Sequence, residues 1–260
     1  MLATIRSCTL VGLEGVLVDV EVDVHPGQAG RFDIVGLPDA AVQESKERVR
    51  SAIHNSHLTF PLQNITVNLA PADLRKVGPA FDLPMAVGVL ACAHQLPPEF
   101  GASMFIGELS LDGSVRHVNG IVSMASYARA EGLNPIYVPA VDAPEAALIP
   151  GLTVIPVESL GQLAMHLTNM LPIPPYDPAA HGEEEPEPIY ATDFAEIRGQ
   201  EHVKRALEVA AAGAHAVLMS GPPGSGKTLL ARSLPSILPR MAIEEALEVT
   251  KVYSVAGLLP

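Results

Sequence analysis

The chain has 260 residues, of which 48% are hydrophobic and 17% charged, and its formal net charge is −13 at pH 7. This composition indicates a globular protein of one large or two small domains, with aliphatic cores because tryptophan is absent. The negative charge argues against a DNA interface within these residues, and no apolar run is long enough to cross a bilayer. The N-terminus lacks a signal-peptide pattern, so we expect a cytoplasmic protein with no membrane partner.

Residues 1–170 predict a mixed α/β domain. Two alternating, β-branched segments, 3–10 and 15–24, flank a glycine turn and predict a β-hairpin. The later elements expected are a helix from Pro38 and Asp39, a strand at 65–69, an apolar helix capped by Asp82, a strand pair within 107–115, a helix at 120–131, strands at 136–139 and 153–157, and a helix from Ser159. Strands that alternate with helices imply at least one parallel crossover.

Residues 171–190, LPIPPYDPAAHGEEEPEPIY, form the clearest boundary. They contain six prolines and five acidic residues, with no lysine or arginine. Such a stretch buries little and resists both helix and sheet. We therefore expect an acidic linker between the domain at 1–170 and a second region at 191–260.

The second region contains the motif GPPGSGKT, which predicts a phosphate-binding P-loop, or Walker A motif. An apolar strand is expected at 215–219, and a helix is expected to follow the glycine-rich turn. Glycines let backbone N–H groups approach phosphate oxygens, lysine supplies a cation, and threonine supplies a hydroxyl for Mg²⁺. The expected ATP-binding residues are Gly221, Pro222, Pro223, Gly224, Ser225, Gly226, Lys227 and Thr228, with Thr228 also as the metal ligand.

Cysteines and histidines give no further site. Cys8 and Cys92 lie far apart in apolar surroundings, which favours buried, reduced thiols. His54 and His57 are three residues apart near the end of a predicted helix, but no third ligand is spaced to join them.

The front region resembles the C-terminal domain of Lon-type proteases. The resemblance rests on IGELSLDGSVRHVNGIVSMASYARAEGLNPIYVP and GLTVIPVESLGQL, and it spans roughly residues 78–171. In that family a serine in a G-P-S-A-G stretch is activated by a lysine after a G-G-L turn. Here Ala80 stands at the serine position and Val122 at the lysine position, while Ser123 and Lys76 occupy neither. The resemblance therefore implies the fold without peptidase activity.

The second region resembles the YifB/ComM branch of the magnesium-chelatase-like AAA+ ATPases. The string IRGQEHVKRALEVAAAGAHAVLMSGPPGSGKT carries this resemblance, and its position after a Lon-like domain narrows it to YifB/ComM. In AAA+ proteins the segment before the first helix packs beside adenine, so Ile197, Gly199 and Gln200 are expected there. The alternative for these three residues is a plain capping turn.

The resemblance implies a homo-hexameric, ATP-driven motor that acts on DNA, with branch migration as its activity in ComM. Hydrolysis in that family also needs a strand ending in acidic residues (Walker B), a polar sensor and an arginine finger, none of which is found here. Residues 243–251 have helical spacing, so Glu244 and Glu245 are expected on a solvated face. We therefore expect the front portion of a longer protein, which binds ATP without hydrolysing it, with its DNA contacts in the missing C-terminal region.

Two other functions remain open. A magnesium chelatase subunit would use the same ATPase module, although the front domain argues against it. The third alternative is a non-enzymatic, Lon-like interaction module with a vestigial nucleotide site.

Overall fold

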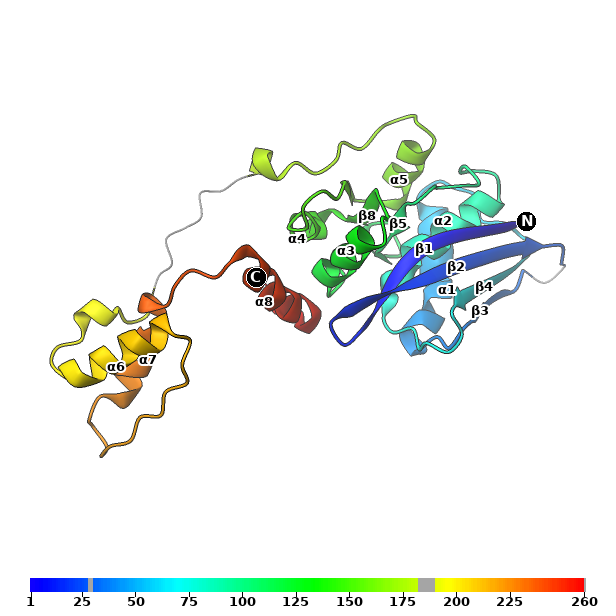
Figure 1. Cartoon of the computed structure of the whole chain (residues 1–260). Helices are drawn as coiled ribbons and strands as arrows, with labels where there is room; N and C mark the ends of the chain where they lie inside the picture. Colours follow the sequence, from blue (N-terminus) through cyan, green and yellow to red (C-terminus); the bar gives the residue numbers. More distant parts are fainter. Residues whose placement is uncertain (28–29, 182–189, 260) are drawn as a thin grey trace. The chain divides into compact units, whose positions relative to one another are not determined.

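The computed structural model describes residues 1–27, 30–181 and 190–259 (Figure 1). The chain divides into two compact units, Met1–His181 with Leu247–Pro260, and Gly182–Ala246. This division differs from the expected one in placing the end of helix α8 (Ile243–Ala256) with the front unit. There the N–H of Gly120 donates to the carbonyl of Ser254 at 3.0 Å. The sequence-based domain boundaries remain a prediction.

A four-stranded sheet forms one half of the front unit. Its order is β1-β2-β4-β3, from β1 (Leu2–Val11), β2 (Glu14–His25), β3 (Phe32–Val35) and β4 (Asn64–Ala70). The predicted hairpin is confirmed, because β1 and β2 pair antiparallel around Gly12, whose φ is +64°. Side chains alternate between buried and less buried along β4, so a single face of the sheet carries the core.

Helices α1 (Ala40–Asn55) and α2 (Asp82–Cys92) pack against the sheet (Figure 1). The start of α1 was predicted correctly: the Asp39 carboxylate accepts from the N–H of Val42 at 2.8 Å, which is an N-cap bond. Every residue of α2 is buried, because the helix lies between the sheet and the rest of the unit. Its apolar composition therefore reflects burial on all sides.

A second, parallel sheet completes the front unit. Its order is β5-β8-β9, from β5 (Met104–Phe105), β8 (Ile136–Pro139) and β9 (Val154–Val157). The elements around it are the hairpin β6 (Glu108–Leu109) and β7 (Val115–Arg116), and helices α3 (Ile121–Ala130), α4 (Ala143–Ala146) and α5 (Leu160–Leu167). The connection from β8 through α4 to parallel β9 confirms the expected crossover.

The predicted role of Asp82 as a helix cap is wrong. Asp82 is the first residue of α2, and its fully buried carboxylate accepts from Arg48 Nε at 2.6 Å and Nη2 at 3.1 Å. The N–H of Leu109 donates to the same carboxylate at 3.2 Å. Burial raises the pKa of Asp82 and the Arg48 guanidinium opposes that rise. One carboxylate thus joins α1, α2 and β6.

Replacement of Arg48 by methionine is expected to destabilise the front unit by about 3–5 kcal/mol, because it leaves the Asp82 carboxylate buried and unpaired. Urea unfolding followed by circular dichroism measures the change. The control is Glu44→Gln, which removes an exposed partner 3.9 Å from Arg48 and should cost less than about 1 kcal/mol. Equal effects of the two substitutions would contradict this role of Asp82.

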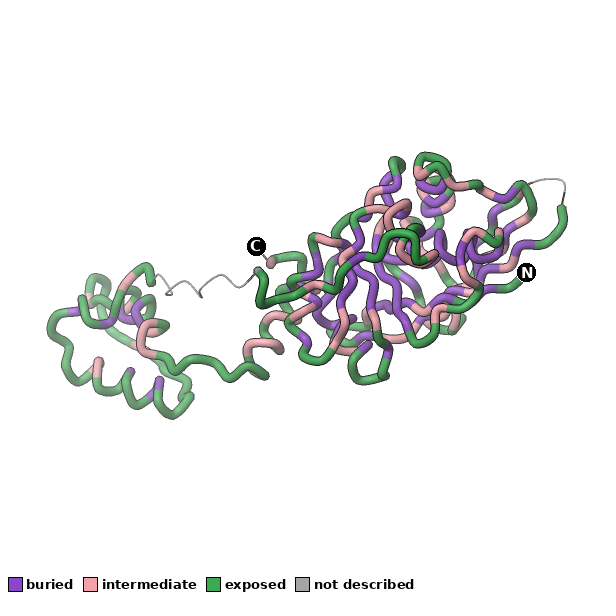
Figure 2. The backbone as a smooth tube through the Cα atoms, turned by 90° about the horizontal axis from the view of Figure 1, so that it is seen from above, coloured by how far each residue is buried: buried purple, intermediate pink, exposed green. Residues whose placement is uncertain are grey.

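The second unit is small and helical. Its helices are α6 (Glu201–Ala212) and α7 (Lys227–Ser233), with 3₁₀ turns at Phe194–Glu196 and Leu234–Ile237. Its core consists of Phe194, Ile197, Leu207 and Leu230. Figure 2 shows how few of its residues are buried compared with the interior of the front unit.

The strand predicted at 215–219 is wrong for this structure. Residues 215–220 belong to no helix or strand, and Leu218 is 96% exposed. A strand needs hydrogen-bonding neighbours, and no strand occurs among the described residues of the second unit. The apolar segment therefore has nothing to pair with.

Residues 171–181 of the expected linker contain only a 3₁₀ turn, Pro178–His181, and residues 182–189 lie outside the described residues. Helix α8 confirms the helical reading of residues 243–251, and Glu244 and Glu245 are exposed. Across the parts of the chain that the structure describes, no helix is both long and apolar enough to span a membrane.

Candidate functional site

The glycine-rich turn depends on two left-handed backbone positions. Gly224 and Gly226 have φ values of +82° and +84°. An added Cβ would meet nothing within 4 Å at either residue, so glycine is required there by backbone conformation and not by lack of space. At Gly221 an added Cβ would lie 3.1 Å from Ser225 Oγ, a tight contact that this side chain would have to relieve by moving. The turn thus keeps its backbone accessible to a ligand.

Helix α7 begins at Lys227, directly after the turn. Gly226 is its N-cap, and the carbonyl of Gly226 accepts from the N–H of Leu230 at 3.0 Å. Leu230 is 3% exposed and packs in the core of the second unit, which fixes the helix against α6. Amide groups at the start of a helix favour anions, so the turn and α7 together suit phosphate.

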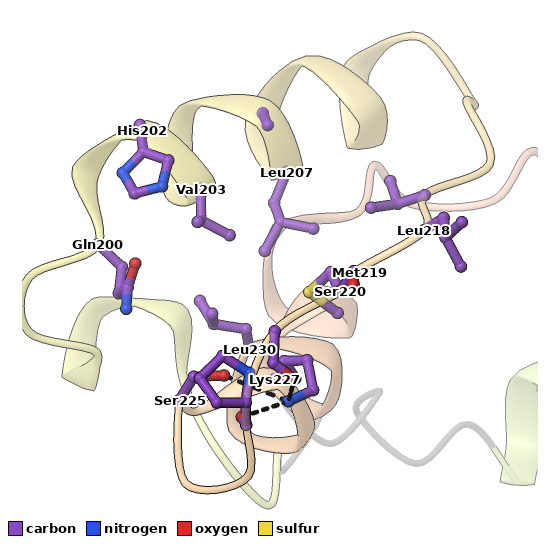
Figure 3. Close-up of a pocket in the computed structure, with 14 residues that line it drawn as sticks. Gln200, His202, Val203, Leu207, Leu218, Met219, Ser220, Ser225, Lys227 and Leu230 are labelled. Carbon is purple, nitrogen blue, oxygen red and sulfur yellow. Dashed lines mark hydrogen bonds between the residues drawn. The ribbon is translucent and has the colours of Figure 1, made fainter.

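Lys227 lies folded back over the turn. Its Nζ donates to the carbonyl oxygens of Gly221 and Pro222, both at 2.8 Å, and to Ser225 Oγ at 3.2 Å (Figure 3). The Lys227 ammonium group thus lies against the carbonyl groups at the start of the glycine-rich turn. Thr228 is exposed in the first turn of α7.

A cavity of about 350 Å³ lies between α6 and this loop. Figure 3 shows α6 side chains on one wall and Ser225 and Lys227 on the other. The lining residues are Gln200, His202, Val203, Ala206, Leu207, Val217, Leu218, Met219, Ser220, Gly221, Pro222, Ser225, Lys227 and Leu230. The lining is mainly apolar and includes the polar side chains of Gln200, His202, Ser220, Ser225 and Lys227, as in many small-molecule sites.

The structure brings only one of the three expected adenine-wall residues to this cavity. Gln200 lines it and makes no side-chain cap bond, whereas Ile197 is 6% exposed inside the core. Gly199, with φ +75°, is not among the lining residues. The sequence-based expectation did not include His202 or Val203. The spacing of Val203, Ala206 and Leu207 on one face of α6 could have indicated Val203.

None of the described residues that line the cavity is acidic. Hydrolysis of a nucleoside triphosphate requires groups that position Mg²⁺ and the attacking water, and carboxylates usually supply them. The cavity therefore offers groups for binding phosphate but no water-activating carboxylate.

Comparison with known proteins places this arrangement in a family. A family model described as subunit ChlI of Mg-chelatase matches residues 20–142, and one described as magnesium chelatase, subunit ChlI, matches residues 193–260. Competence protein ComM of Haemophilus influenzae is 38% identical over 258 residues, which cover 97% of this chain and 50% of ComM. The chain belongs to the ComM/YifB family of magnesium-chelatase-like proteins.

Two further relatives match the chain with similar identity and coverage. YifB of Escherichia coli is 37% identical over 263 residues, covering 98% of this chain and 50% of YifB. An uncharacterised protein of Mycobacterium tuberculosis is 42% identical over 254 residues, again covering 97% of this chain and 50% of the relative. The chain thus spans about half the length of these ComM/YifB relatives.

The Lon-like resemblance is also supported. Lon protease of Rhizobium meliloti is 26% identical over 179 residues, covering 64% of this chain and 22% of that protease. The expected fold class is confirmed: a mixed α/β Lon-like domain is followed by the first part of an AAA+ module.

The positions expected for a Lon-type dyad are apolar in three dimensions. Ala80 is 4% exposed and Val122 is fully buried, and both belong to one apolar cluster with Cys8. Burial raises the pKa of the Cys8 thiol to about 12, so the thiol is protonated at neutral pH and is a poor nucleophile.

Neither of the two remaining candidates forms a dyad. Ser123 is buried, and its Oγ has no hydrogen-bond partner in the described ranges. Lys76 is fully buried, and its Nζ donates to the carbonyl of Pro71. A serine nucleophile needs a base within hydrogen-bond reach, so these residues give no support for peptidase activity.

The chain is therefore expected to release no peptides from casein above the level of a buffer blank. Ser123→Ala and Cys8→Ser should be indistinguishable from the unmodified chain in the same assay, because neither side chain has an activating base. Casein cleavage that disappears in one of these variants would show that a nucleophile does operate in the front unit.

Proposed function

We propose that this chain is the ATP-binding portion of an AAA+ ATPase of the ComM/YifB family. The observation that carries the proposal is the glycine-rich turn, in which two left-handed glycines precede α7 and Lys227 lies over the loop. In this proposal Gly221 through Thr228 hold the triphosphate and Gln200 lies beside the base. Of the P-loop residues, Gly221, Pro222, Ser225 and Lys227 line the cavity, as does Gln200. The apolar wall of α6 supports this assignment, because a nucleobase needs a flat apolar surface.

The residues present also fit Mg²⁺ as the companion of the nucleotide. Magnesium retains most of its waters and is held by one or two protein oxygens together with phosphate oxygens. Thr228, exposed in the first turn of α7, supplies such an oxygen. Bound Mg²⁺ would neutralise phosphate charge, while Lys227 supplies the protein's own cation. The family resemblance supports a homo-hexamer in the cytoplasm for the longer protein.

Lys227→Ala is expected to reduce the affinity of the chain for a fluorescent ATP analogue by at least tenfold, because it removes the cation that faces the phosphates. Fluorescence titration in Mg²⁺ measures the affinity. The matched control is Lys204→Ala, which removes a lysine of the same unit that pairs with Glu201 and does not line the cavity.

The affinity of Lys204→Ala for the ATP analogue should equal that of the unmodified chain. Neither Lys227→Ala nor Lys204→Ala should release phosphate from ATP, since no described cavity residue is acidic. Equal binding by the unmodified chain and Lys227→Ala would refute the phosphate assignment. Absence of nucleotide binding by the unmodified chain would favour the non-enzymatic alternative, in which the front unit is an interaction module.

For the longer protein we propose a DNA-acting motor of the branch-migration or helicase type. The relative named as a competence protein supports this proposal, as does the Lon-like domain before the AAA+ module. Because this chain has a net charge of −13 and DNA is also negative, we expect the DNA contacts in other parts of the longer protein. The second candidate is a magnesium chelatase subunit, which the descriptions of the two matching family models favour.

A full-length member of the family with this chain as its first half separates these two candidates. Its ATP hydrolysis is expected to rise severalfold with branched DNA and to be unaffected by a porphyrin with Mg²⁺. Phosphate release is measured with each additive in turn. Stimulation by the porphyrin alone would favour the chelatase role.

A further inference from the structure

Three side chains of the kinds that bind metals converge in the front unit, which does not contain the P-loop. They are His117, which follows β7, Asp142 and Glu145; each offers one ligand atom, and these atoms lie within 4.8 Å of one another. Asp142 and Glu145 are three residues apart at the start of α4, so one turn places them on the same side. No other such group of His, Cys, Asp or Glu occurs among the residues that the structure describes.

Each of the three side chains is held by a neighbour through an atom other than the one it can offer a metal. His117 Nε2 lies 2.9 Å from Asn119 Oδ1, so Nδ1 remains directed at the carboxylates. The N–H of Val118 donates to Asp142 Oδ2 at 2.9 Å, which leaves Oδ1 facing His117. Metal-binding histidines commonly donate their second ring N–H to a fixed oxygen. The cluster therefore already has the outer contacts of a metal site.

The third side chain is oriented in the same way. Glu145 Oε2 accepts from Ser254 Oγ at 3.0 Å, which leaves Oε1 available. Its ligand atom lies within 4.8 Å of the ligand atom of Asp142. Two carboxylates this close repel each other, and a cation between them removes that cost.

The cluster is also accessible from solvent. Asp142 is 1% exposed, while 52% of the His117 side chain is exposed. His117 and Asn119 line a cavity of about 500 Å³ in the front unit, so an ion and its remaining waters can reach the site. Gly78, Pro79 and Ala80, which the resemblance aligns with the Lon nucleophile stretch, also line this cavity.

We propose that His117, Asp142 and Glu145 bind a divalent transition-metal ion. One imidazole nitrogen and two carboxylate oxygens suit Zn²⁺, Mn²⁺ or Co²⁺ better than Mg²⁺, which prefers oxygen ligands alone. His117 Nδ1 and Asp142 Oδ1 lie 2.5 Å apart, within hydrogen-bond distance, and a metal ion bound between them would replace the proton of that hydrogen bond. Three protein ligands leave at least one position for water. This site is independent of the nucleotide site.

Calorimetric titration of the chelator-treated 260-residue chain with Zn²⁺, without nucleotide, tests the site. One equivalent is expected to bind, and Co²⁺ at the same site should give visible absorption bands. Asp142→Asn and Glu145→Gln should each weaken Zn²⁺ binding at least tenfold, as should His117→Ala. Zn²⁺ should also raise the melting temperature of the unmodified chain, and the same Zn²⁺ concentration should raise that of Glu145→Gln by less.

The matched control is His25→Ala. His25 also pairs with an aspartate, since its Nδ1 lies 3.3 Å from Asp23 Oδ2, but it belongs to no three-ligand group among the described residues. Zn²⁺ affinity should be unchanged in this variant. Absence of Zn²⁺ binding by the unmodified chain, or equal loss in His25→Ala, would overturn the proposal. If His117→Ala or Asp142→Asn fails to fold, Glu145→Gln decides, because Glu145 is only partly buried.

Discussion

The backbone conformation at Gly224 and Gly226 is the constraint on which the second unit depends. These two left-handed residues turn the chain so that α7 begins at Lys227 and Leu230 reaches the small core. The same turn presents the carbonyl groups that hold the Lys227 ammonium. Folding of the second unit and the proposed phosphate binding would thus depend on the same few torsion angles.

The front unit combines a preserved framework with an altered centre. Arg48 and Asp82 connect two helices and a hairpin through a buried ion pair, which keeps the position of α2 well defined. Ala80 and Val122, which the resemblance aligns with the serine and the lysine of the Lon family, lie in one buried apolar cluster. Buried apolar groups need no hydrogen-bond partners. Replacing both the hydroxyl and the amine by apolar side chains therefore changes the stability of the fold little.

Much of the fold was predictable because its signals are local. The hairpin follows from alternation around Gly12, and α1 follows from a cap at Asp39. Strands β3 and β5, with four and two residues, are too short to show a period, and only neighbouring strands define them. Residues 215–220 show the opposite situation. The apolar pattern of a strand is present, but among the described residues no neighbouring strand is there to pair with it.

The sites were predictable to different degrees for the same reason. The P-loop is contiguous, so its residues could be read from one motif. The wall of the cavity depends on how α6 packs, which placed Ile197 in the core and His202 at the cavity. His117 and Asp142 are 25 residues apart in sequence and meet only because β8 and α4 follow α3, so no spacing rule could have joined them.

The extended segment before the loop also affects how this chain behaves in solution. Leu218 is 96% exposed and Val217 is 42% exposed, on a backbone without ladder partners. An exposed apolar segment of this kind can pair with the same segment of another molecule as a β-strand. Self-association of the isolated chain should therefore begin at this segment, and a charged residue in place of Leu218 would be the simplest way to keep the protein monodisperse.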